Sequence, residues 1–170
     1  MPLLGLYTGA RLNELCQLYV NDIKEIDKVW CIDINRNTND KKLKNASSER
    51  VIPIHPKLIE LGFLNFVKEQ KKNNSQRLFS HLKLGSDGYI KNVSRFFNVK
   101  WLPEIGVKTS KKSFHSLRHT FANELKQLGV NEQVASELLG HASQSITYGR
   151  YGKESRVDNI FIVLKNLVFI

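Results

Sequence analysis

The chain has 170 residues, 41% of them hydrophobic and 25% charged, which is ordinary for one globular domain. Its formal net charge of +10 points to an anionic partner, most commonly nucleic acid, although a solvated basic surface that only aids solubility is the alternative. No apolar run is long enough to span a bilayer, and Cys16 and Cys31 have neither a metal-binding spacing nor a disulfide framework. These properties argue against a membrane-spanning or disulfide-stapled protein and favour the reducing environment inside a cell.

The chain opens in the pattern of a buried helix. The first residues lack the charged segment that begins a signal peptide and read as the middle of a helix, so we expect further sequence upstream. Apolar side chains at helical spacing predict a helix over residues 3–20 that is broken at Thr8 and Gly9. One of these two residues would cap a new helix near Arg11, where free backbone N–H groups favour anions. A helical arginine that merely pairs with Glu14 is the plainer alternative.

A change in the spacing of the hydrophobic residues along the chain then predicts a small antiparallel sheet in the N-terminal third. Its strands are expected at residues 23–26, 29–34 and 50–54. The polar, lysine-rich stretch between the last two strands, residues 35–48, is typical of a hairpin tip that faces a partner. Because lysine runs are usually only solvated, a role for Lys44 depends on the rest of the chain.

The remainder predicts helices. The first begins at Pro56, and its expected inward side chains are Leu58, Ile59, Leu61, Leu64 and Phe66. The second covers about residues 90–102, with the apolar side chains Val93, Phe96, Phe97 and Val99. The third is capped by Ser113 and closed by Gly129.

The end of the chain predicts two further helices and an apolar tail. Asn131 caps a short helix that ends at Gly140, and a helix or turn is expected over residues 145–151. The tail over residues 157–170 must be buried, either on its own domain or on a neighbouring copy. We find no internal repeat and no low-complexity segment.

Ionisable side chains crowd one turn of the third helix. His115 and His119 are four residues apart with Arg118 between them, so all three point roughly the same way. Guanidinium groups such as Arg11 and Arg118 suit the charged oxygens of a phosphodiester under attack. Imidazoles such as His115 and His141 can shuttle a proton or donate to an oxygen.

Two further residue types complete a phosphoryl-transfer chemistry. Tyr148 and Tyr151 are candidate nucleophiles if nearby cations lower the phenol pKa. Lys44, on a mobile hairpin, could protonate a leaving alkoxide.

A metal-dependent reaction is disfavoured, and we expect no metal or cofactor. Magnesium needs clustered carboxylates, and the nearest acids, Glu124, Glu137 and Glu154, form no convincing set. Zinc at the two helical histidines does not fit the H-E-x-x-H pattern, because Ser116 follows the first histidine. For those histidines, helix capping or a polar place in the core is the alternative.

Four motifs resemble those of the tyrosine recombinases, the phage-integrase family. They are T-G-A-R-L-N-E-L at 8–15, H-S-L-R-H-T at 115–120, L-L-G-H at 138–141 and R-Y-G at 150–152. Each is weak alone, but they occur in the family's order with a lysine hairpin between the first two. The resemblance implies a mainly helical α+β fold like the DNA breaking-rejoining catalytic domain, with its small sheet near the N-terminal third. Residues 1–170 would be that domain as a C-terminal fragment of a longer protein, without the family's N-terminal DNA-clamping domain.

The resemblance also implies roles for the matching residues. The implied catalytic set is Arg11, Lys44, His115, Arg118, His141 and Tyr151, supported by Glu14 and His119. Glu14 would help orient the site, and His119 would support the helix or help hold the phenol. Lys42 is the alternative to Lys44, because the hairpin register is soft. Tyr148 is the alternative to Tyr151, because the family's usual gap after Gly-His ends between the two tyrosines.

The implied protein is a site-specific recombinase that cleaves and rejoins double-stranded DNA through a 3′-phosphotyrosyl intermediate. It would act as a homotetramer on DNA at full length, with the fragment alone as a monomer, in the cytoplasm of a bacterial or phage system and associated with the nucleoid. A type IB topoisomerase-like activity, a catalytically inactive DNA-binding remnant and a non-specific basic binding protein are the alternatives.

Overall fold

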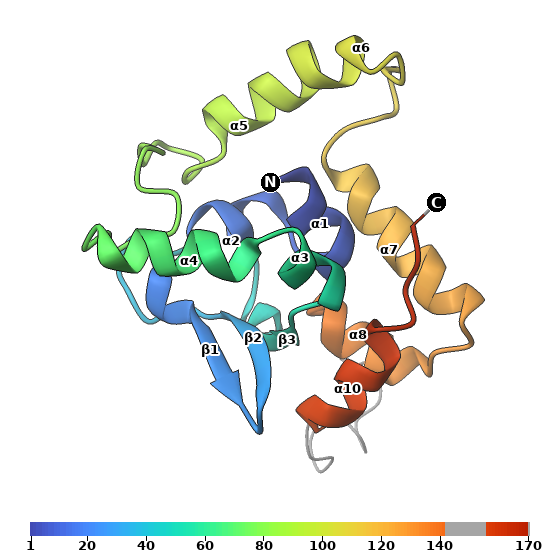
Figure 1. Cartoon of the computed structure of the whole chain (residues 1–170). Coiled ribbons are helices and arrows are strands. Elements are labelled where there is room, and N and C mark those ends of the chain that lie inside the picture. The colour runs from blue at the N-terminus through green and yellow to red at the C-terminus, as the bar shows by residue number, and fades with distance from the viewer. Residues whose placement is uncertain (142–155, 170) are drawn as a thin grey trace.

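The computed structural model describes residues 1–141 and 156–169. As predicted, a small antiparallel sheet lies against a larger set of helices (Figure 1). The chain begins with α1 (Pro2–Thr8) and α2 (Leu12–Cys16), which are separated at Gly9 by a left-handed residue with φ of 62°. The predicted break is confirmed, but the predicted cap is wrong: Arg11 itself is the N-cap of α2, while the Thr8 hydroxyl accepts from the Ala10 amide.

The sheet follows the short 3-10 helix η1 (Val20–Asp22). Its strands are β1 (Ile23–Ile26), β2 (Val29–Ile34) and β3 (Arg50–Pro53), hydrogen-bonded in the order β1-β2-β3. Ile32 in the central strand pairs with Ile23 on one side and Ile52 on the other, and all three are buried. The strands predicted at residues 23–26, 29–34 and 50–54 are therefore confirmed, the third ending at Pro53. The long connection from β2 to β3 holds the 3-10 helix η2 (Ala46–Ser48).

The helix predicted from Pro56 is two helices, α3 (Pro56–Glu60) and α4 (Phe63–Lys72). Gly62, with φ of 86°, separates them and redirects the chain. Because of that turn, Ile59 and Leu61 are 38% and 52% exposed, so their predicted inward positions are wrong. Phe63 and Val67 of α4 are buried in their place.

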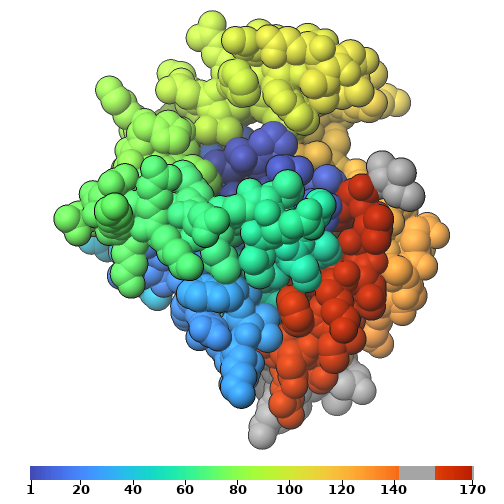
Figure 2. Space-filling model, viewed as in Figure 1, coloured from blue at the N-terminus to red at the C-terminus, as the bar shows by residue number. Residues whose placement is uncertain are grey.

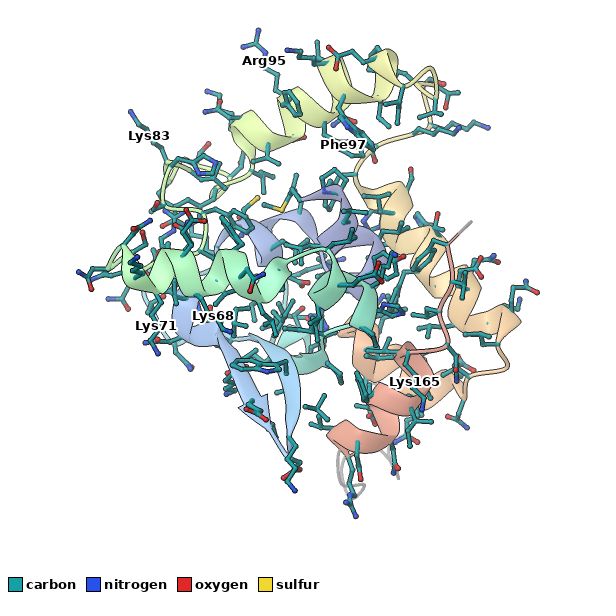
Figure 3. All side chains as sticks on the ribbon, in the orientation of Figure 1. Lys68, Lys71, Lys83, Arg95, Phe97 and Lys165 are labelled. Atoms are coloured by element: carbon teal, nitrogen blue, oxygen red, sulfur yellow. The ribbon has the colours of Figure 1, made fainter. Side chains whose placement is uncertain are left out.

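An outlying arm consists of α5 (Lys91–Arg95), the π-helix η3 (Phe96–Trp101) and α6 (Leu102–Glu104). It lies apart from the sheet (Figure 1), and Figure 3 shows Phe97 on its inner side and Arg95 pointing away. Of the four apolar side chains predicted there, only Phe97 is buried; Phe96 and Val99 are 51% and 69% exposed. The predicted helical segment is present, and one side of the arm packs on the domain.

The helix with the two histidines is α7 (His115–Gln127), and it packs along α1. Ser113 does not cap it, contrary to prediction; the Ser113 amide instead donates to Ser116 Oγ. Gly129 ends the turn after α7 with φ of 67°. The next helix, α8 (Glu132–Leu139), is capped by the Asn131 side chain and ended by left-handed Gly140, as predicted.

The apolar tail packs on its own domain. Helix α10 (Val157–Leu164) lies against β2 and β3, and Figure 2 shows the end of the chain beside the sheet. Ile160 and Leu164 of this helix, and Leu167 after it, are buried. The side chain of His55 hydrogen-bonds the Leu167 carbonyl at 3.1 Å, which holds the end of the tail against the start of α3. In the structure the tail thus takes the first of the two places that the sequence left open. None of the helices in residues 1–141 and 156–169 has the length and apolar content needed to cross a membrane.

Candidate active site

Six of the predicted site residues line one cavity of about 260 Å³. They are Arg11, Lys44, His115, Arg118, His119 and His141. They come from α2, the β2–β3 connection, α7 and the end of α8, so segments far apart in the sequence meet here.

Arg11 lies at the first turn of α2 and is held by its neighbours. Its Nη1 donates to Glu14 Oε1 at 2.7 Å and to Ser48 Oγ at 3.2 Å, and its backbone amide donates to Glu14 Oε2. The pairing with Glu14 that the sequence offered as the plain alternative is therefore present. It does not remove Arg11 from the cavity, because the carboxylate lies behind the guanidinium and does not line the cavity.

Arg118 is the most buried cation of the site, with 5% exposure. Its Nη1 donates to the Gly9 carbonyl at 2.8 Å, and its Nη2 donates to the Leu139 carbonyl and to His141 Nε2. One guanidinium thus ties α7 to the α1–α2 turn and to the end of α8. Burial, and then the charges of Arg11 and Arg50, lower the pKa of Arg118 to about 10, which still leaves it charged at neutral pH.

Arg50 is the residue that the sequence reasoning missed. Its Nη2 pairs with Glu14 Oε2 at 2.8 Å, its Nε donates to the Leu138 carbonyl and its Nη1 to the Ser48 carbonyl. It thereby joins α2, α8 and η2 behind the cavity. A signal was present: Arg50, Ile52 and Ile54 alternate along one predicted strand, so Arg50 had to share the inward face of two isoleucines.

Glu14 is the negative charge that these arginines share. Burial by itself raises its pKa, but the charge and hydrogen bond of Arg50, together with the hydrogen bonds from Arg11, outweigh burial and hold the pKa below its usual value. Glu14 therefore stays ionised at neutral pH and orients both guanidinium groups.

Lys44 reaches the cavity from the β2–β3 connection, whereas Lys42 does not line it. Lys42 instead has its backbone bound to α2, its amide donating to Gln17 Oε1 and its carbonyl accepting from Asn13 Nδ2. The geometry separates two lysines that the sequence could not. Asn45, which the sequence analysis had not singled out, also lines the cavity.

The three imidazoles that line the cavity belong to exposed residues. His115 and His119 meet edge to face with ring centres 4.8 Å apart. Burial, followed by the charges of His119 and Arg118, lowers the pKa of His115; burial, followed by Arg118 and Arg11, lowers that of His141. Both rings are consequently neutral at pH 7 and able to exchange protons or donate hydrogen bonds.

The electrostatics suit an oxyanion. Guanidinium groups at Arg11 and Arg118 and the ammonium of Lys44 surround the cavity, and the nearby carboxylate of Glu14 is already engaged by two arginines. Among residues 1–141 and 156–169 there is no group of three or more His, Cys, Asp or Glu that could hold a metal ion. The predicted nucleophile Tyr151 and its alternative Tyr148 lie outside the described residues.

Solved structures share this architecture. The integrase from mycobacterium phage Brujita superposes with a TM-score of 0.61 at 18% identity, covering 96% of this chain and 49% of that chain. The XerH site-specific recombinase bound to its difH substrate gives 0.58 at 22% identity, covering 93% of this chain and 42% of that one. The fold is therefore that of a tyrosine recombinase catalytic domain.

The chain belongs to the phage integrase family, whose model matches residues 1–156. The tyrosine recombinase of Thermosipho africanus is 33% identical over 145 residues, which are 83% of this chain and 44% of that protein. Tyrosine recombinase XerC of Proteus mirabilis is 31% identical over 143 residues, 82% of this chain and 42% of that protein. The chain thus spans less than half the length of these curated relatives.

Proposed function

We propose that this chain is the catalytic domain of a site-specific tyrosine recombinase that cleaves and rejoins double-stranded DNA. The observation that carries the proposal is the convergence of two guanidinium groups, one ammonium and three imidazoles on one cavity. This arrangement matches the charge that develops on a phosphodiester under attack. Family membership supports the same conclusion.

In the proposed reaction, the phenol oxygen of Tyr151 attacks phosphorus and the bond from phosphorus to the 5′ oxygen breaks. The phenol proton passes to neutral His115, and Lys44 supplies the proton that the departing 5′ oxygen needs. Arg11, Arg118 and His141 stabilise the negative charge on the non-bridging oxygens. The product is a 3′-phosphotyrosyl link and a free 5′-hydroxyl, and reversal of the same steps rejoins a strand without ATP, metal or cofactor.

The proposed partner is double-stranded DNA, which agrees with the net charge of +10. At full length we propose a homotetramer that joins two duplexes, with the fragment alone as a monomer. The proposed location is the cytoplasm of a bacterial or phage system, at the nucleoid.

A trapping assay tests the nucleophile. The substrate is a set of nicked duplexes that tile candidate recombination sites, because a nick lets the short product diffuse away and leaves the protein attached. Tyr151→Phe should abolish the covalent adduct while DNA binding persists, and Tyr148→Phe should retain the adduct. The reverse result would make Tyr148 the nucleophile.

The alternatives predict different products. A topoisomerase would relax supercoiled plasmid without joining strands from two duplexes, whereas a recombinase yields products with strands from both. An inactive remnant or a non-specific binding protein would bind every duplex in a salt-sensitive manner and would form no adduct on any of them.

A further inference from the structure

Lys44 lies on an irregular connection, yet the residues just before it are held firmly. The side chain of Lys41 is only 2% exposed, and its Nζ lies 2.8 and 2.7 Å from the two carboxylate oxygens of Asp22. The same Nζ donates to Asn35 Oδ1 at 2.7 Å, and Asn35 Nδ2 donates to Asp22 Oδ1. All three donor directions of a buried ammonium are therefore satisfied.

The neighbours of Lys41 are fixed as well. The carboxylate of Asp40 accepts from the hydroxyl groups of Tyr19 and Tyr89. The backbone of Lys42 is bound on both sides to α2, through Gln17 and Asn13. Residues 40–42 thus form an anchor, which we call the hairpin root.

The segment after Lys44 is fixed to the cavity itself. Ser48 Oγ donates to Asn45 Oδ1 at 2.6 Å and accepts from Arg11 Nη1 at 3.2 Å. Lys44 therefore lies between two fixed points of the chain, the hairpin root before it and Ser48 after it, which contacts Arg11. Its ammonium position depends on both attachments, since a free lysine stem has many rotamers.

A buried ion pair is weak evidence for a purely stabilising role. The cost of desolvating both charges offsets much of their attraction, and apolar residues of similar volume often stabilise as well or better. The Lys41–Asp22 pair instead fixes the position of the chain, because an ammonium bonded to three fixed oxygens holds the backbone in one register. This matters for Lys44, because a displacement of a reacting group by about 1 Å can slow a reaction roughly 100-fold.

We propose that Lys41, bound to Asp22 and Asn35 in the hairpin root, is a positioning residue that sets Lys44 at the cavity for protonation of the leaving oxygen. The inference rests on the proposed function, and it adds a buried residue that does not line the cavity.

The test compares Lys41→Met with Lys24→Met in the full-length protein. Lys24 is the matched control, because it also pairs with an aspartate of the sheet region, Asp33, at 2.7 Å but is 45% exposed. The probe is the nicked duplex that the wild-type protein cleaves, made with either oxygen or sulfur at the bridging 5′ position. A thiolate leaves without help, because a thiol has a pKa of about 8.5 and needs no general acid at neutral pH.

Lys41→Met should slow adduct formation on the oxygen substrate by roughly 10-fold to 100-fold and leave the sulfur substrate within about 3-fold of wild type. Lys24→Met should match wild type on both. The double variant Lys41→Met/Lys44→Ala should cleave the oxygen substrate no more slowly than Lys44→Ala alone, because the hairpin root acts through Lys44. The inference would be overturned if Lys41→Met slowed adduct formation equally on both substrates, or if it cleaved the oxygen substrate at the wild-type rate.

Hydrogen exchange at the backbone amides of residues 42–45 checks the anchor without catalysis. Lys41→Met should accelerate exchange there, and unchanged exchange would overturn the inference. If Lys41→Met does not fold, Tyr89→Phe is the milder variant, because it removes only one hydrogen bond to Asp40. It should slow adduct formation on the oxygen substrate by a smaller factor, and the sulfur substrate should again restore the rate. If the wild-type protein forms no adduct on either substrate, the proposed function is refuted. Hydrogen exchange would still test whether Lys41 holds residues 42–45 in place.

Discussion

Arg118 donates a hydrogen bond from Nη2 to Nε2 of His141 across 2.9 Å. A guanidinium has no acceptor atom, so Nε2 must be the unprotonated nitrogen and the neutral ring carries its hydrogen on Nδ1. The lowered pKa of His141, caused by burial and by nearby Arg118 and Arg11, agrees with this assignment. Nδ1–H is therefore the group that His141 can offer to a phosphate oxygen.

The first prediction concerns acid pH. Protonation of His141 would replace the acceptor of Arg118 with a second cation. Adduct formation should therefore fall as the pH drops through the pKa of His141, which lies below the ordinary histidine value of about 6.5. His141→Gln keeps an acceptor oxygen without a titrating group, and it should show a shallower fall on the acid side. Rates of adduct formation from about pH 5.5 to about pH 8 on the nicked duplex measure this. A profile identical to wild type would refute the role of the pair, since titration of His115 alone would then explain it.

The second prediction compares two arginines at the ends of the β2–β3 connection. Arg50→Met leaves Glu14 buried with part of its pairing lost, and it should lower the free energy of unfolding by about 3–5 kcal/mol. Arg36→Met breaks only an exposed pair with Glu49, 3.1 Å apart, and should cost less than about 1 kcal/mol. Urea denaturation of both variants measures the difference. Equal losses would show that the buried network behind the cavity is not what stabilises this end of the sheet.

The third prediction uses two glycines of similar backbone conformation. Gly140 and Gly129 have φ of 63° and 67°, so alanine at either should cost about 1–2 kcal/mol in backbone strain. A Cβ at Gly140 would also lie 2.8 Å from Arg50 Nη1, whereas at Gly129 it would meet nothing within 4 Å. Gly140→Ala should therefore lose clearly more stability than Gly129→Ala, and it should also slow cleavage, because it displaces Arg50 from its pairing with Glu14 behind the cavity. Thermal denaturation and the adduct assay together test this; indistinguishable variants would contradict it.

The fourth prediction follows from His55. Its Nδ1 accepts from the Lys57 amide, so its Nε2 carries the hydrogen donated to the Leu167 carbonyl, and burial lowers its pKa. In the unfolded chain the imidazole takes up a second proton as the pH drops below about 6.5, whereas in the folded chain it stays neutral to lower pH. Stability is therefore full above about pH 6.5 and falls as the pH drops below it.

His55→Asn retains a side-chain acceptor for the Lys57 amide without a titrating group. It should therefore weaken the loss of stability between about pH 7 and about pH 5. Urea midpoints across that range, compared with wild type, measure the change. Because His115 and His141 also have lowered pKa values, part of the slope should remain in this variant.

The sequence alone located much of the scaffold, since local patterns report local structure. The changed spacing of hydrophobic residues predicted strands at 23–26, 29–34 and 50–54, and the caps Asn131 and Gly140 marked a helix that the structure contains. The site motifs could be recognised because each is a short stretch of sequence, and within one of them His115 and His119 share a helical turn. No local pattern, however, showed that Ile59 would be exposed, because the turn at Gly62 redirects the chain only in the packed domain.

Tertiary structure decided how the motifs meet. Whether Lys44 or Lys42 reaches the cavity depends on hydrogen bonds from α2, and the partners of Arg50 lie on helices distant in sequence. The tail could equally have covered a second molecule; its packing on β3 reflects the shape of a surface assembled from separate segments. The sequence by itself determined which chemical groups are present and which of them share a helical turn. Only folding set the distances between them, because electrostatic and hydrogen-bond energies depend on separation in space.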